Sequence, residues 1–137
     1  MKHIKQFDAV VCGAGHAGVE AALILNRFKI STALITIDPL AIGRMSCNPA
    51  IGGLAKGQIV KEIDVLGGIM GKATDYSALQ YKILNKSKGK SVWSPRAQVD
   101  KRTYEGFINN TIKKAKYITV LAGEIVDIVT DNGVVTA

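Results

Sequence analysis

Cysteine is scarce in this chain, which excludes a disulfide framework and a thiolate metal site. The two cysteines among the 137 residues, Cys12 and Cys47, lie far apart and outside any CxxC or metal-ligand spacing. So few thiols are typical of a reducing compartment. We predict that no metal is bound. We expect Cys12, inside a strand-like run, to pack in the core.

Long apolar runs are also missing. None approaches the roughly 18 residues that a membrane span needs, and the N-terminus MKHIKQFDAVVC passes directly from polar residues into a strand-like run. The sequence shows no secretory signal, so we predict a cytoplasmic protein without membrane contact. The 47% apolar and 21% charged residues are typical of a globular domain.

Acidic residues are rare in the segment from Lys82 to Lys116. Ten Lys or Arg stand there against two acids, a net charge of +8, whereas the whole chain carries +7. Such a segment would attract a polyanion in a salt-dependent manner. A solvated lysine-rich surface that keeps the protein soluble is an equal alternative.

Catalytic constellations are absent as well. Neither paired carboxylates nor a Ser-His-Asp arrangement can be assembled, so no catalytic residue is assigned. Cys47 is a candidate nucleophile or redox partner, with a small buried thiol as the alternative. His16 is a candidate proton donor, although its position in a glycine turn favours a role for its backbone.

What is present is a glycine turn in a βαβ context. The run FDAVVC (residues 7–12) predicts a strand, a helical pattern follows the turn, and STALITI (31–37) predicts a second strand. Between them lies a GxGxxG pattern, in which Gly13 permits a tight turn, Gly15 lets a pyrophosphate approach, and Gly18 lets the helix pack on the strand. This pattern indicates a dinucleotide site, and a glycine turn that only packs helix on sheet is the alternative.

The acid that usually receives the ribose hydroxyls is missing. Thr36 stands about where it would fall, and Asp38 precedes a proline, so its direction is open. A P-loop is excluded, because Lys56 is followed by Gly57 and Gln58 in place of Ser or Thr.

The segment GRMSCNPAIGGLAKG (43–57) has neither strand nor helix periodicity, although connections usually run to about 4–6 residues. Either the loop wraps a ligand or it is an ordered structural Ω-loop. We expect Gly52 and Gly53 to admit a cofactor, Asn48 to offer hydrogen bonds and Pro49 to stiffen the approach.

Beyond the loop, periodicity predicts helices over 59–66, ended by Gly67-Gly68, and over 102–115. The buried face of the second helix should carry Tyr104, Phe107, Ile108 and Ile112. Strands follow at 118–121, 125–129 and 134–135, with Asn132-Gly133 as a hairpin turn. Because the chain stops in the last strand, we expect it to be the N-terminal part of a longer protein.

Three strings carry a family resemblance: MSCNPAIGG (45–53), GQIVKEIDVLGG (57–68) and ILNKSKGKSVWSPRAQVDK (83–101). They closely resemble the N-terminal region of the tRNA uridine 5-carboxymethylaminomethyl modification enzymes, the MnmG/GidA family, over essentially the whole chain. A Thr at the position of Thr36 is usual in that family. After SKG the family usually has Pro-Ala, and Lys90-Ser91 here puts the local loop shape in doubt.

The resemblance implies an α/β fold: a Rossmann-like FAD-binding domain of glutathione-reductase type, with a parallel sheet, helices and a β-meander, incomplete at its C-terminus. Residues 1–137 would be its N-terminal part, without the NADH-binding insertion and the C-terminal helical domain. The implied enzyme adds a carboxymethylaminomethyl or aminomethyl group to carbon 5 of the wobble uridine of certain tRNAs, using FAD, NADH and methylenetetrahydrofolate. A GTPase partner (MnmE) would complete a heterotetramer, and the full-length protein would be a homodimer. A non-enzymatic nucleotide- or RNA-binding fragment and an inactive truncated product are the alternatives.

By the same likeness, FAD would be held by Gly13, Ala14, Gly15, His16, Ala17 and Gly18, with Ile125 at the adenine end. The basic stretch contains Tyr81 and Trp93, which could stack on unpaired bases while cations track phosphates. The nucleic-acid candidates are Lys88, Arg96, Lys101 and Arg102.

Overall fold

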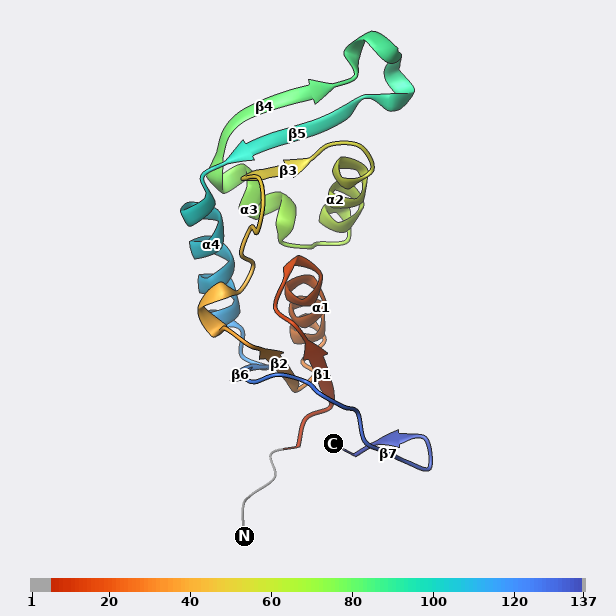
Figure 1. Cartoon of the computed structure of the whole chain (residues 1–137), viewed down its shortest axis with the longest axis vertical. Helices are drawn as coiled ribbons and strands as arrows, with labels where there is room; N and C mark the ends of the chain where they lie inside the picture. The colour runs from red at the N-terminus through yellow and green to blue at the C-terminus, as the bar shows by residue number, and fades with distance from the viewer. Residues whose placement is uncertain (1–5, 137) are drawn as a thin grey trace.

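Residues 6–136 are described by a computed structural model, in which two small sheets lie at opposite ends of an elongated molecule (Figure 1). A parallel sheet lies at the end near both termini, and an antiparallel sheet lies at the other. Helices fill the space between them, with α4 running along one side. No described helix has the length and hydropathy needed to cross a membrane.

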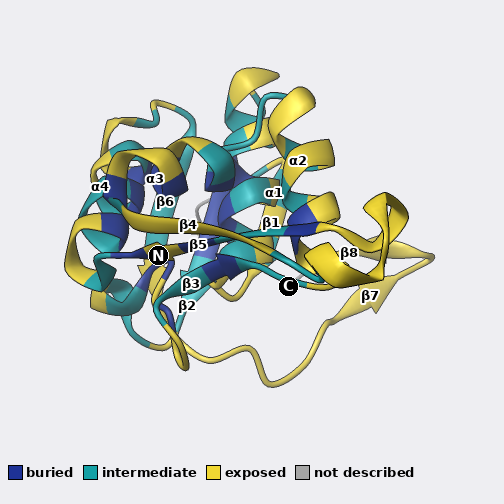
Figure 2. Cartoon of the chain, turned by 90° about the horizontal axis from the view of Figure 1, so that it is seen from above, coloured by how far each residue is buried: buried dark blue, intermediate teal, exposed yellow. Residues whose placement is uncertain are grey.

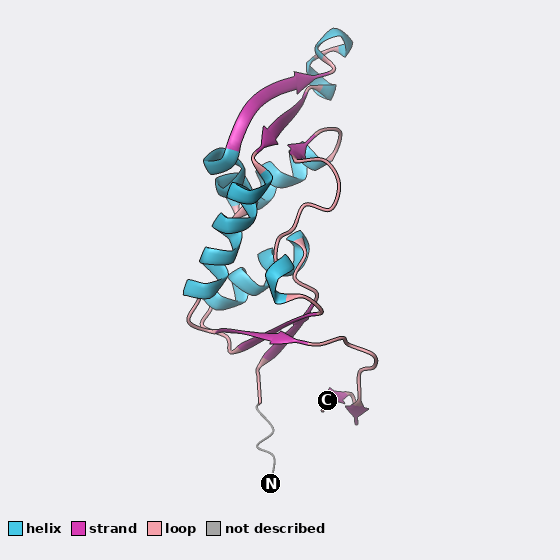
Figure 3. Ribbon diagram, turned by 60° about the vertical axis from the view of Figure 1, so that its left-hand side comes forward, coloured by secondary structure: helices cyan, strands magenta, loops and turns pink. Residues whose placement is uncertain are grey.

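The parallel sheet contains β1 (Ala9–Cys12), β2 (Thr32–Thr36) and β6 (Ile118–Ala122) in the order β1-β2-β6. Val11, Leu34 and Val120 are partners in its register. Helix α1 (His16–Arg27) connects β1 to β2, which confirms the predicted βαβ unit. Both α1 and α4 lie on the same side of this sheet (Figure 3).

Cys12 is exposed, so its prediction as a core residue is wrong. Exposure alternates along β1, where Val10 and Cys12 are exposed while Ala9 and Val11 are half-buried. Successive side chains of a strand point to opposite faces. Cys12 therefore points to the face that the helices do not cover.

The antiparallel sheet contains β3 (Ala50–Gly52), β5 (Ser94–Val99) and β4 (Ala78–Leu84) in that order, with α2 (Lys56–Val65) and α3 (Met70–Ser77) packed on one face. Helix α2 confirms the helix predicted over 59–66. The sequence pattern had not indicated α3, β4 or β5. The predicted long loop is in fact interrupted, because β3 and the start of α2 lie within residues 43–57.

The β4–β5 connection carries two short 3₁₀ turns, η2 (Lys86–Lys88) and η3 (Lys90–Val92), at the tip of a projecting hairpin. A third, η1 (Pro39–Ala41), follows β2.

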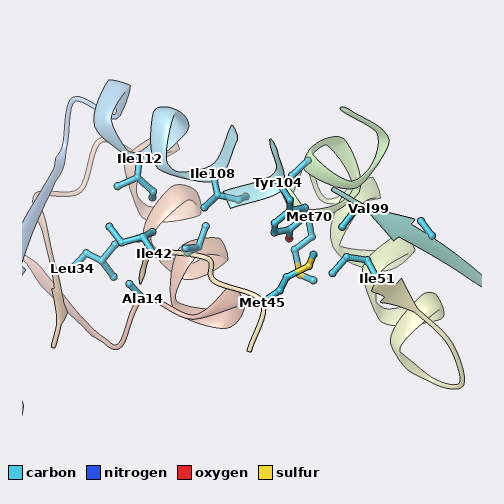
Figure 4. Close-up of a cluster of buried hydrophobic side chains, with 14 residues drawn as sticks. Ala14, Leu34, Ile42, Met45, Ile51, Met70, Val99, Tyr104, Ile108 and Ile112 are labelled. Carbon is cyan, nitrogen blue, oxygen red and sulfur yellow. The ribbon is translucent and has the colours of Figure 1, made fainter. Parts of the chain in front are cut away.

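Helix α4 (Lys101–Lys114) links the two sheets. It begins at Asp100, whose carboxylate accepts a hydrogen bond of 2.7 Å from the Thr103 backbone N–H, a standard N-cap contact. Its buried face confirms the prediction for Tyr104, Ile108 and Ile112, whereas Phe107 is partly buried. Figure 4 shows these side chains in one apolar cluster that runs from Leu34 to Ile51 and Val99.

Side chains of α1 also tie the two halves together. The Glu20 carboxylate accepts hydrogen bonds from the backbone N–H groups of Ile69 (3.0 Å) and Met70 (2.7 Å) at the start of α3. Arg27 donates to the carbonyls of Leu66 (3.1 Å) and Gly67 (3.2 Å), where α2 ends. Helix ends carry unpaired backbone groups, so these contacts satisfy α2 and α3 while fixing their position on α1.

The strand predicted over 125–129 is wrong. That segment has no regular structure, because no described strand pairs with it. Its apolar residues stay exposed, and Val126 is 89% exposed. The predicted hairpin turn is confirmed between β7 (Thr130–Asp131) and β8 (Val134–Val135), where Asn132 and Gly133 both have positive φ. The α/β class with a parallel sheet and covering helices is confirmed.

Candidate dinucleotide site

The glycine turn lies between the carboxyl end of β1 and the start of α1. Gly13 has φ +93° and its N–H donates to the Ile35 carbonyl at 2.7 Å, which holds the turn against β2. A Cβ on Gly18 would collide with the Gly13 carbonyl. Only glycine at position 18 therefore lets α1 pack this closely on the turn, as the sequence predicts.

The first turn of α1 offers free backbone donors. Gly15 is its N-cap without a side-chain cap, and the first intrahelical bond runs from Val19 N–H to the Gly15 carbonyl at 2.9 Å. The N–H groups of His16 and Ala17 precede that bond and have no intrahelical acceptor. The first turn contains no acidic residue, so the partial positive charge of the helix end is not neutralised.

Space for a ligand exists at this point. A Cβ built on Gly13 or Gly15 would meet no atom within 4 Å. Ala14 between them is buried, and its carbonyl accepts from Gly43 N–H at 2.9 Å, which anchors the turn to the following loop. An open surface of backbone donors at a positive helix end fits a diphosphate group.

The end of β2 carries Thr36, the residue that the sequence places where a ribose-binding acid would usually stand. Thr36 ends β2, and its carbonyl accepts from Gly123 N–H at 3.0 Å. Asp38 is already engaged, because its carboxylate accepts from Leu40 N–H at 2.9 Å and forms an ion pair with Arg44 at 3.4 Å. Asp38 therefore caps η1, which leaves Thr36 as the side chain at the strand end.

Ile125 lies two residues beyond the Gly123–Thr36 contact, so the segment that carries it starts beside the end of β2. It is 40% exposed and belongs to no strand, in contrast to the expected strand position. Its predicted contact with an adenine stays a prediction.

His16 contacts a residue that the sequence did not connect to this site. Its ring packs edge-on against Tyr104 of α4, with ring centroids 5.7 Å apart and planes at 87°. Burial lowers the pKa of His16, and the nearby charge of Lys56 lowers it further. The imidazole therefore carries no positive charge at neutral pH, so the attraction for an anion comes from the backbone N–H groups and the partial charge at the start of α1.

Tyr104 is fully buried, and its hydroxyl is the one buried side-chain polar atom without a hydrogen-bond partner within residues 6–136. Burial raises the pKa of this phenol, so it stays protonated. Figure 4 shows the ring next to Met45 and Met70. The sequence placed Tyr104 on the buried face of its helix but gave no signal that this face reaches the glycine turn.

The loop after η1 differs from its expected role. A Cβ on Gly52 would collide with the Pro95 carbonyl of β5, so this glycine serves the close approach of two strands, a role the sequence did not suggest. Gly53 has φ +108° and open space, and its N–H donates to the same carbonyl at 3.0 Å. Cys47 is exposed, which makes the buried-thiol alternative wrong. Asn48 lies beside it and is also exposed.

The predicted nucleic-acid residues are not brought together. Lys88 lies in the hairpin tip, Arg96 lies within β5, and Lys101 and Arg102 begin α4 beyond the opposite end of β5. The structure instead pairs Arg96 with Lys82 of β4 in register.

Residues 6–136 contain no cluster of three His, Cys, Asp or Glu side chains arranged to hold a metal.

Comparison with known proteins matches the chain to one family and to relatives that share one name. The family described as Glucose inhibited division protein A matches residues 8–137. The tRNA uridine 5-carboxymethylaminomethyl modification enzyme MnmG of Ureaplasma parvum serovar 3 is 48% identical over 132 residues, which cover 96% of this chain and 22% of that protein. The corresponding Aquifex aeolicus protein is 49% identical over 129 residues, covering 94% and 21%. The chain thus spans about one fifth of the length of these curated relatives.

Solved structures agree with the fold. Aquifex aeolicus GidA in its form I crystal aligns with a TM-score of 0.89 at 49% identity, over 96% of this chain and 22% of that chain. Thermovibrio ammonificans THI4 aligns with a TM-score of 0.53 at 17% identity, over 95% and 44%, which indicates a shared fold alone.

Proposed function

Because this chain belongs to the Glucose inhibited division protein A family, we propose that it is the N-terminal, FAD-binding part of a tRNA-modifying flavoenzyme. The observation that carries the cofactor assignment is the glycine turn, with its uncapped helix end and open space at Gly13 and Gly15. The relatives at 48–49% identity are named for modification of a tRNA uridine.

In this function the backbone N–H groups of Gly15, His16 and Ala17 would bind the diphosphate of FAD, and Thr36 would lie nearest the ribose. Ala14 and Gly18 would hold the turn in shape, and Ile125 would cover the adenine. When bound, the flavin supplies hydride transfer, with NADH as the reductant. The neutral His16 ring packs on Tyr104 and so fixes the first turn of α1 in the orientation that presents its amides.

The rest of the proposed activity follows from family membership. We infer that the full-length protein adds a carboxymethylaminomethyl or aminomethyl group to carbon 5 of a wobble uridine, with methylenetetrahydrofolate as the one-carbon donor. Its proposed partners are tRNA, a GTPase of the MnmE family in a heterotetramer, and a second copy of itself. Its proposed location is the cytoplasm.

A fluorescence titration of FAD with the purified chain tests the cofactor assignment. We expect saturable but weak binding, because the residues assigned to FAD would contact its diphosphate, ribose and adenine and leave the isoalloxazine half without contacts. Amide NMR spectra recorded on the same sample report whether the protein is folded. A well-dispersed spectrum together with a flat titration would contradict the assignment.

A further inference from the structure

The antiparallel sheet has one covered face and one bare face. Helices α2 and α3 pack on the face that carries Ile51 and Ala97. On the other face lie Lys82 of β4 and Arg96 of β5, which are direct partners in the strand register, followed by the pair Gln80 and Gln98. Figure 2, seen from this end of the molecule, shows β4 exposed along most of its length.

Two cations directly opposite each other are an unfavourable pair in an antiparallel sheet. Neither has a carboxylate partner, because the one ion pair within residues 6–136 joins Arg44 and Asp38. Arg96 is only half-exposed, so its charge is partly withdrawn from water. A repulsive pair held in register without a counter-charge is explained if an anion binds between the two side chains.

Both cations line a cavity of about 370 Å³ on this face. Its other polar lining residues are three amides, Asn48, Gln80 and Gln98, and it contains no acidic residue. Asn48 reaches the cavity because β3 lies tightly against β5, which the missing side chain of Gly52 permits. Leu84 adds an apolar surface.

An amide side chain offers a donor and an acceptor side by side, which matches the edge of a nucleobase. Two cations beside three amides therefore fit a ligand with both a phosphate and a base. Strands β4 and β5, which line the cavity, form a hairpin whose tip carries Lys86, Lys88 and Lys90. Lys82 lies two residues before the end of β4, about 7 Å along the strand at about 3.3 Å per residue, so a polyanionic chain can contact both Lys82 and the lysines of the tip.

We propose that this face of the β3-β5-β4 sheet binds one unpaired nucleotide of an RNA strand. Lys82 and Arg96 hold its phosphate, and Asn48, Gln80 and Gln98 contact the edge of its base. The proposal rests on the proposed function, since it names where the tRNA substrate meets this part of the protein. The hairpin tip would then contact phosphates further along the same strand.

The test measures binding of an unmodified tRNA transcript and a fluorescein-labelled decauridylate by anisotropy across a series of salt concentrations. Lys82→Gln/Arg96→Gln should weaken binding of both RNAs at least tenfold at low salt. For a single strand each phosphate that is no longer neutralised reduces the slope of log K against log salt by about 0.7, so the decauridylate slope should fall by about 0.7. Lys113→Gln/Lys114→Gln, the same charge change at the far end of α4, is the matched control and should change affinity less than twofold.

The amide contacts need a separate readout. A decamer of the same charge with abasic sites in place of its bases should bind the native chain more weakly than decauridylate. Gln98→Ala should reduce this preference and leave the salt slope unchanged, whereas the double cation variant should weaken binding of both decamers. Removing a repulsive pair does not destabilise a fold, so thermal melting of the cation variant should occur at or above the native temperature.

The outcomes separate the two proposals. If the native chain binds the tRNA transcript and the Lys82/Arg96 variant binds it equally well, this face is not the site, and the proposed function stands. If the native chain binds neither RNA, this site is overturned, and the FAD titration still decides the proposed function. Equal loss in the Lys113/Lys114 control would show only a general effect of charge and would overturn the site.

Discussion

Gly15→Ala is the most direct test of the diphosphate site, because it adds one methyl group where the structure is empty. Gly15 has φ −70° and ψ −173°, which alanine adopts without strain, and its Cβ would meet no atom within 4 Å. The unfolded chain loses entropy on the change, whereas alanine is a poorer N-cap than glycine. These effects oppose each other, so the free energy of unfolding should change by less than about 0.5 kcal/mol.

Binding of FAD should respond differently. The added methyl group occupies the surface through which a diphosphate would approach the N–H groups of His16 and Ala17. Loss of one hydrogen bond to a charged group costs about 1.5 kcal/mol or more, so Kd should rise roughly tenfold. The assay is FAD fluorescence titration, paired with thermal melting of the same samples.

Two further glycines provide controls. Gly106→Ala, inside α4 with equally open space around it, should leave FAD affinity unchanged. It should raise the melting temperature slightly, because alanine is about 0.5–1 kcal/mol more favourable than glycine in a helix interior. Gly18→Ala forces a Cβ into the Gly13 carbonyl and should destabilise the fold by about 1–3 kcal/mol, as overpacking does. If Gly15→Ala melts normally and binds FAD like the native chain, the diphosphate does not lie on this turn.

Two other predictions concern the aromatic contact below the turn. Tyr104→Phe removes a buried hydroxyl without a partner, so the melting temperature should stay the same or rise. Tyr104→Ala should lower the free energy of unfolding by about 3–5 kcal/mol, because the buried ring is lost. A clearly lower melting temperature for Tyr104→Phe would contradict the absence of a hydrogen-bond partner. The pKa of His16 is lowered by burial and then by Lys56, so the unfolded state binds more protons below pH about 6.5 and stability should fall as the pH decreases through that range. The melting temperature of the native chain should fall between pH 7.5 and 5, and that of His16→Gln should fall less. An identical pH dependence in the two proteins would refute the lowered pKa of His16.

Much of the first half of the fold could be predicted because its signals are local. A strand, a glycine turn and a helix follow one another within residues 9–27, and each glycine requirement arises from neighbours in the chain. The buried face of α4 was equally readable from its 3.6-residue period. The strand predicted over 125–129 failed because its apolar residues have no described strand to pair with, which no local pattern reveals.

The sequence by itself determined the dinucleotide turn, the missing ribose acid and the excess of positive charge after Lys82. Only the tertiary structure decided that Arg96 lies opposite Lys82, that Tyr104 packs against His16, and that Gly52 lies close to the Pro95 backbone. These pairs lie between 14 and 88 residues apart in the chain. Their contacts depend on strand register and helix packing, which arise when separate segments bury a common core, and a single sequence does not record which distant residues then meet.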